Sequence, residues 1–150
     1  TLDLAKPEYD AFSQIFLLHP LKKNLKLKKR QMQVALDAYE AASNYKVQQV
    51  TTAATYWSAK IYQDFAIAMM ESDRPSGLSA EEFDQYEILL EEQAYPFEEQ
   101  AIEIHELNAS RISDNVYDEW VKKSLAELAV LSPAQYVKAE RSEDLVQNIY

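Results

Sequence analysis

A regular stripe of apolar residues runs through the most acidic stretch of this chain. Between Arg74 and Arg111 the sequence has ten acidic residues and no lysine or arginine. Within that stretch, apolar residues recur every three or four positions, which is the spacing of one helix face. The members of the stripe are Phe83, Tyr86, Leu90, Ala94, Phe97, Ala101 and Ile104. The pattern predicts a long helix with one buried face and one anionic face.

The composition favours a single all-α domain. The chain has 150 residues, 47% of them apolar, and its one glycine, Gly77, leaves few loops that need a positive φ. There are no cysteines, which excludes disulfides, thiolate zinc sites and cysteine nucleophiles. The sequence starts at Thr1 without an apolar signal segment and has no stretch long enough to span a bilayer. We therefore expect no transmembrane segment, and a processed product or an excised domain.

Apolar periodicity predicts four long helical elements. They cover residues 24–44, 47–71, 79–110, and from near Asp114 to Ser132-Pro133. Ser79 and Glu82 fit a capping box at the start of the third element. Because the apolar stripe keeps its phase across Pro96, we predict one long helix kinked near Pro96 rather than two helices.

The predicted domain organisation has three parts. Residues 1–20 form an N-terminal segment that is either helical or extended, residues 21–136 form the helical domain, and residues 137–150 form a polar C-terminal tail with at most a short helix. Four helices with short connections fit either a closed bundle or stacked helical hairpins.

Charge is distributed unevenly along the chain. The net charge is −10, and residues 51–150 hold twenty acidic but only seven basic groups. Such a field repels phosphate backbones, so we expect no nucleic-acid partner. The exception is the basic cluster Lys22–Arg30, which has three readings: a solvated helix face, a contact to an anionic membrane, or a complement to an acidic surface.

Small and aromatic residues favour stacked hairpins. Ala35, Tyr39 and Ala42 are spaced like the alanine, aromatic and alanine on the second helix of a tetratricopeptide repeat (TPR), and Ala59 with Tyr62 resembles the start of the next repeat. This resemblance implies antiparallel helical hairpins stacked as part of an α-solenoid. Further along, Ala101 fits the second-helix alanine, but His105 and Asn108 stand where an aromatic and an alanine are expected.

A longer resemblance covers about Gln31 to Tyr136. The strings that carry it are Tyr56–Ala66, Gly77–Ser79, Leu90–Glu99, Tyr117–Trp120 and Ser132–Tyr136. In this order they resemble the C-terminal part of bacterial TPR proteins of the type associated with gliding motility or TonB systems. The resemblance implies a periplasmic or cell-envelope scaffold for protein–protein interaction, without catalysis, although a cytoplasmic location stays open. The long helix containing Pro96 departs from a regular repeat.

Few residues suggest catalysis or metal binding. His19 and His105 have no second histidine at helical spacing, and Ile102 stands where a di-iron bundle would need a glutamate. The one glycine excludes most phosphate-binding and nucleophile-elbow motifs. The dense carboxylates Glu91, Glu92, Glu98 and Glu99 are better explained by a solvated helix face than by a metal-dependent active site. We predict no catalytic residues, no metal and no cofactor.

The TPR geometry supplies the predicted partner site. First-helix residues on the concave side would contact a protein or peptide partner, and here they are Tyr56, Lys60, Gln63 and Asp64. The main alternative is a homo-oligomerisation module in which Trp57, Trp120 and several tyrosines form an adhesive face. A carboxylate-based metal-dependent enzyme is the weaker alternative.

Overall fold

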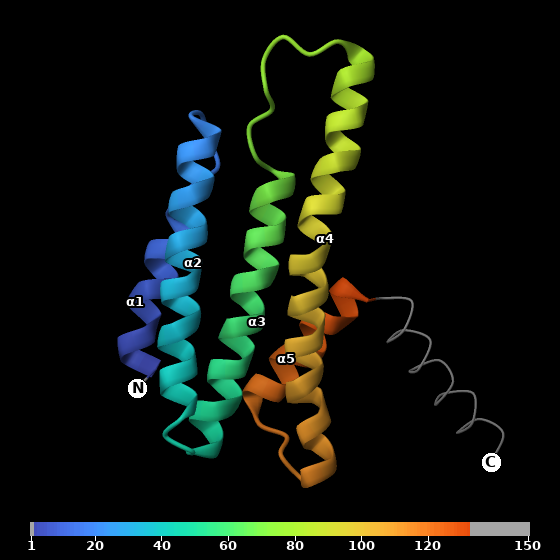
Figure 1. Ribbon diagram of the computed structural model, residues 1–150. Helices are drawn as coiled ribbons and strands as arrows, with labels where there is room; N and C mark the ends of the chain where they lie inside the picture. The colour runs from blue at the N-terminus through green and yellow to red at the C-terminus, as the bar shows by residue number, and fades with distance from the viewer. Residues whose placement is uncertain (1, 133–150) are drawn as a thin grey trace, which may run out of the picture.

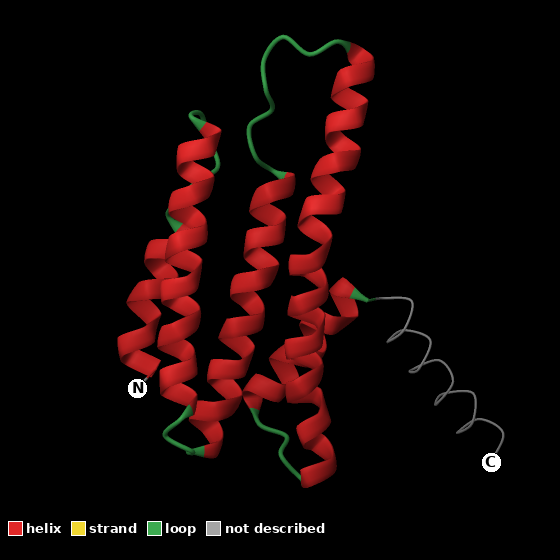
Figure 2. Cartoon of the chain, viewed as in Figure 1, coloured by secondary structure: helices red, strands yellow, loops and turns green. Residues whose placement is uncertain are grey.

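A computed structural model describes residues 2–132 of the chain, and this part is all-α. Its helices are α1 Leu2–Ser13, α2 Leu21–Ser43, α3 Gln48–Met70, α4 Ala80–Ser110 and α5 Glu119–Leu131, with a short 3₁₀ turn η1 Arg111–Asp114. Within residues 2–132 there is no strand, and loops join the helices (Figure 2). The predicted fold class is confirmed at the level of an all-α protein.

The three long helices lie close to their predicted positions. α4 begins at Ala80, and Ser79 is its N-cap residue. The Ser79 side chain accepts a hydrogen bond from the Glu82 amide, and the Glu82 carboxylate accepts one from the Ser79 amide. These two bonds form the predicted capping box. α4 then continues unbroken through Pro96 to Ser110, so the stripe belongs to one helix as expected. Its inner face buries Leu90, Ala94 and Ala101.

The start of the last helix differs from the prediction. Asp114 does not begin a helix, because Arg111–Asp114 form the 3₁₀ turn and Asn115 follows in the left-handed region at φ 63°. α5 begins four residues later, where Asp118 Oδ1 accepts from the amides of Trp120 and Val121, each at 3.0 Å. Asp118 satisfies two amides that no helical carbonyl can reach, which makes it the cap. The predicted end at Ser132 agrees with the structure.

The N-terminal segment joins the main core. Its residues Leu2–Ser13 form α1, in which Ala5 and Phe12 are fully buried among side chains of α2 and α3. The segment is therefore helical over Leu2–Ser13, whereas residues 15–18 of it have no regular secondary structure. The predicted tail 137–150, and residues 133–136 of the predicted helical domain, lie outside the described residues.

α3 is the central helix of the structure. Successive helices run in alternating directions, and α3 lies between α2 and α4 (Figure 1). It packs most extensively against these two helices and makes smaller contacts with α1 and α5. The α3/α4 pair has the most extensive contact and includes the rings of Phe65 and Phe97, which meet edge to face with centroids 4.6 Å apart. α5 is short and lies beside the lower half of α4 (Figure 1). The upper halves of α3 and α4 are therefore not covered by α5.

Candidate functional site

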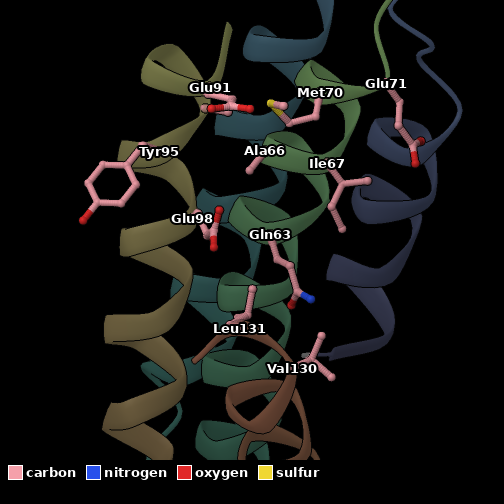
Figure 3. Close-up of a pocket in the computed structure, with 11 residues that line it drawn as sticks. Gln63, Ala66, Ile67, Met70, Glu71, Glu91, Tyr95, Glu98, Val130 and Leu131 are labelled. Carbon is pink, nitrogen blue, oxygen red and sulfur yellow. The ribbon is translucent and has the colours of Figure 1, made fainter. Parts of the chain in front are cut away.

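A groove of about 520 Å³ lies between the C-terminal part of α3, the middle of α4 and the end of α5. Its apolar lining residues are Ala66, Ile67, Met70, Ala94, Val130 and Leu131. Figure 3 shows these residues on the three helices, with Val130 and Leu131 at the lower end of the hollow and the Tyr95 ring directed outward at its edge. We call this hollow the acidic groove, for the charges described next.

Three glutamates line the acidic groove together with the apolar residues. Glu71 is the C-cap residue that follows α3, and Glu91 and Glu98 lie on α4. All three side chains are exposed. No lysine or arginine lines the groove, and within residues 2–132 none of the three glutamates forms an ion pair. Within the described residues, the groove therefore combines an apolar floor with negative charge that no basic side chain balances.

The apolar surface around the groove is unusually open to solvent. Ile67, Tyr95 and Val130 expose 44%, 58% and 73% of their surface. A second hollow of about 270 Å³ shares Ile67 and Glu71 with the groove and reaches the loop after α1, where Phe16 is 63% exposed. Contiguous exposed apolar side chains rimmed by polar groups mark an interaction surface.

The four predicted partner-binding residues lie on α3 but differ in accessibility. Tyr56 and Gln63 are buried, at 9% and 5% exposure, whereas Lys60 and Asp64 keep about a quarter of their side-chain surface exposed. Gln63 lines the acidic groove and donates from Nε2 to Glu127 at 2.8 Å. The other three do not line it.

Intramolecular contacts already involve the remaining three residues. Lys60 Nζ lies 3.2 Å from Asp64 Oδ1, and Asp64 also accepts from the Tyr9 hydroxyl of α1. Burial lowers the pKa of Lys60, but Asp64 and Glu127 outweigh this effect and raise it above its ordinary value. Tyr56 packs against the rings of Trp57 and Trp120. The partner role of these residues stays a prediction.

A buried polar cluster joins α3, α4 and α5 below the groove. His105, Asn108 and Ser124 are each 0% exposed. Asn108 Nδ2 donates to the Thr52 carbonyl oxygen at 2.9 Å and to Ser124 Oγ at 3.0 Å, and Ser124 Oγ also lies 3.0 Å from His105 Nδ1. Burial lowers the pKa of His105 to about 4, so the imidazole is neutral at pH 7.

The buried cluster links helices and is not accessible to a substrate. A serine within hydrogen-bond distance of a histidine is an arrangement used in nucleophilic catalysis. Here neither side chain has any exposed surface, so a substrate cannot reach Ser124 Oγ. Within residues 2–132 there is also no group of three or more His, Asp or Glu side chains placed to hold a metal ion.

The basic cluster Lys22–Arg30 separates into one buried and several exposed side chains. Lys28 is 4% exposed, and its ammonium donates to the carbonyl oxygens of Phe12 at 2.9 Å and Ile15 at 2.8 Å. These carbonyls belong to the end of α1 and the loop after it, so the Lys28 ammonium caps the C-terminal end of α1. Burial lowers the pKa of Lys28. The neighbouring basic side chains are exposed.

Sequence reasoning missed the exposed apolar residues of the groove. Glu91 and Glu98 belong to the carboxylate group already noted, and Gln63 to the predicted partner site. Ile67, Tyr95 and Val130 were not singled out, because each lies on a different helix. The sequence did offer one indication: Tyr95 and Ile67 are apolar but lie outside the periodic apolar positions that predict the buried face of their helices.

Comparisons with known proteins add no family assignment. No protein-family model, no curated protein and no solved structure matches this chain. In the part that the structure describes, none of the helices combines the length and the hydropathy needed to cross a membrane.

Proposed function

We propose that this chain is a non-catalytic scaffold that binds a protein partner through the acidic groove, within a bacterial cell-envelope assembly. One observation carries the proposal: the groove exposes apolar side chains of three helices beside three glutamates that have no ion pair in residues 2–132. Desolvating such a surface is favourable when a partner supplies apolar and basic groups.

The packing of the helices supports a TPR-like arrangement. α1 and α2 form one hairpin and α3 and α4 form the next, and α2 also packs against α3. The first helices α1 and α3 contact each other, and α3 contacts α5 in the same way. The set Ala35, Tyr39 and Ala42 is buried on α2. On α4 the set Ala101, His105 and Asn108 has the same spacing and is also fully buried. His105 and Asn108 thus fill the inner positions of a second hairpin, with polar groups that bond to α3 and α5.

The chemistry of the groove indicates its kind of partner. A helix that carries apolar side chains on one face and lysines or arginines beside them fits an apolar groove with an acidic edge. Attraction between exposed charges steers the encounter more than it adds affinity. The envelope location rests on the sequence resemblance described above.

A pair of charge-reversed variants tests the groove. Glu91→Lys with Glu98→Lys reverses the groove, while Asp84→Lys with Glu92→Lys makes the same change in charge at exposed α4 residues that do not line it. Each is used as bait in an envelope extract of the bacterium that makes the protein. We expect the groove variant to lose a partner that the wild type and the control variant retain.

Crosslinking provides a second measurement. A photoreactive amino acid replaces Tyr95 in the groove or, as the control, Ile88, which is exposed on α4 but does not line the groove. We expect a crosslinked partner at position 95 and none at position 88. Equal capture by all variants, or crosslinking at both positions alike, would show that the groove is not the binding site.

A further inference from the structure

The outer face of α2 carries exposed basic and apolar side chains in a regular pattern. Lys23, Leu27, Arg30 and Val34 recur at spacings of four and three, and Lys26 lies beside them. All are exposed, including Leu27 and Val34 at 41% and 42%. We call this set the basic face of α2. A hollow of about 340 Å³ beside Leu27 is lined by Lys23, Lys26 and Arg30.

Among the described residues 2–132, the basic face has no acidic partner. Residues 21–36 contain no aspartate or glutamate, and within the described residues Lys23, Lys26 and Arg30 form no ion pair. α2 packs against α3 through its opposite side, where Met32, Ala35 and Tyr39 are buried. The basic face therefore cannot turn into the acidic groove of the same copy.

We propose that the acidic groove binds the basic face of α2 from a second copy of this chain. Leu27 and Val34 supply apolar side chains at helical spacing for a floor made by Ala66, Met70 and Ala94. Lys23 and Arg30, beside these apolar groups, supply positive charge for Glu91 and Glu98. Within the described residues of one copy, each surface lacks what the other provides.

The resulting contact is heterologous. One copy contributes α2 and the other contributes the groove of α3, α4 and α5, so each copy retains one unused surface. Association therefore continues head to tail instead of stopping at a symmetric dimer. The tryptophans are not needed for it: Trp57 and Trp120 pack on each other inside one chain, with ring centroids 6.2 Å apart.

Self-association uses the groove of the proposed function and therefore rests on it. Sedimentation velocity of the full chain, over a wide concentration range, measures the association directly. We expect the average mass to rise with concentration at low salt and to fall when salt is added, because screening shortens the reach of exposed charges from about 10 Å at 0.1 M to about 3 Å at 1 M.

Two neutral variants then separate the two surfaces. The face variant is Lys23→Gln, Leu27→Gln and Arg30→Gln, and the groove variant is Ile67→Gln, Glu91→Gln and Glu98→Gln. Glutamine preserves helix propensity. We expect either variant alone to associate at least about tenfold more weakly than the wild type. The control variant Asp84→Asn, Ile88→Gln and Glu92→Gln changes exposed α4 residues outside the groove and should associate like the wild type.

Mixing the two variants is the decisive step. The groove variant keeps an intact α2 face, and the face variant keeps an intact groove, so one productive contact forms between them. We expect a 1:1 complex that does not grow further, which also shows that both variants are folded. A monomeric wild type at every concentration, or a mixture without a 1:1 complex, overturns self-docking. Loss of a foreign partner by the charge-reversed groove variant would then still support the proposed function.

Discussion

Asn108 on α4 donates from its side-chain amide to the backbone carbonyl oxygen of Thr52 on α3, across 2.9 Å. The same amide reaches Ser124 of α5, so one buried side chain links three helices. Asn108 occupies the position where the repeat pattern expects an alanine. A polar residue is stable there because its donors are satisfied, while its Oδ1 atom has no partner among the described residues.

Truncation of this residue should destabilise the protein. Asn108→Ala removes the amide that donates to the Thr52 carbonyl oxygen and to Ser124 Oγ, and it opens a small cavity, so we expect the free energy of unfolding to fall by about 1–3 kcal/mol. Urea denaturation monitored by circular dichroism measures the change. Gln100→Ala, at an exposed position of the same helix, should change it little.

The buried histidine should make stability depend on pH. Burial lowers the pKa of His105 from 6.5 to about 4, while the charge of Glu127 opposes this shift and that of Lys60 adds to it. The unfolded chain therefore binds a proton first as the pH falls. The contribution of neutral His105 is complete above pH 6.5 and is lost as the pH falls towards 4.

The measurement compares wild type with His105→Gln. Over that pH range the free energy of unfolding of the wild type should fall more steeply than that of the variant, by up to about 1.4 kcal/mol per pH unit. Parallel curves for the two proteins would mean that His105 titrates normally in the folded state.

The buried ammonium of Lys28 should stabilise the junction between α1 and α2. Lys28→Met keeps most of the apolar stem but removes both hydrogen bonds to the carbonyls of Phe12 and Ile15. We expect a loss of about 1–3 kcal/mol, because those carbonyls lose a charged donor. Lys29→Met, at the adjacent exposed position, is the control for losing one positive charge. Equal stability of the two variants would count against this role.

The cap of α5 can be tested by comparing two aspartates. Asp118→Ala removes the acceptor for two amides and for the Thr52 hydroxyl, so we expect a loss of about 2 kcal/mol. Asp114→Ala, in the 3₁₀ turn, should have little effect. Thermal unfolding of both variants measures the difference. A larger loss of stability for Asp114→Ala than for Asp118→Ala would support the helix start predicted from the sequence.

Replacing Pro96 should strengthen α4. Proline supplies no amide for the helical bond to the carbonyl four residues earlier, and the side chain is exposed in the middle of a continuous helix. We expect Pro96→Ala to raise the free energy of unfolding by about 1–3 kcal/mol. A lower stability would show instead that proline at this position favours the packing of α4 against α3.

Much of the fold could be predicted because its signals are local. The apolar stripe of α4 placed Leu90, Ala94 and Ala101 in the core, and the capping box at Ser79 fixed where the helix starts. The start of α5 was misplaced because Asp114 and Asp118 are equally good caps in isolation. Only the turn through Asn115, with its left-handed φ, decided between them.

The candidate site was predicted only in part, for a different reason. Glu91 and Glu98 stand out in sequence as charge, yet their meaning depends on apolar neighbours such as Val130, which come from a distant part of the chain. Lys28 shows the same limit, since nothing in the run Lys22–Arg30 distinguishes the one lysine that is buried.

By itself, the sequence determined that this chain is helical, where its long helices run, and that its second half is strongly acidic. Periodicity, caps and charge act over one or two turns, so they can be read along the chain. Tertiary structure decided that α5 ends beside the lower half of α4 and leaves the upper α3/α4 surface open. That outcome depends on burial between residues far apart in sequence, such as the contacts of Asn108 with Thr52 and Ser124, and it is what turns an acidic helix face into a groove.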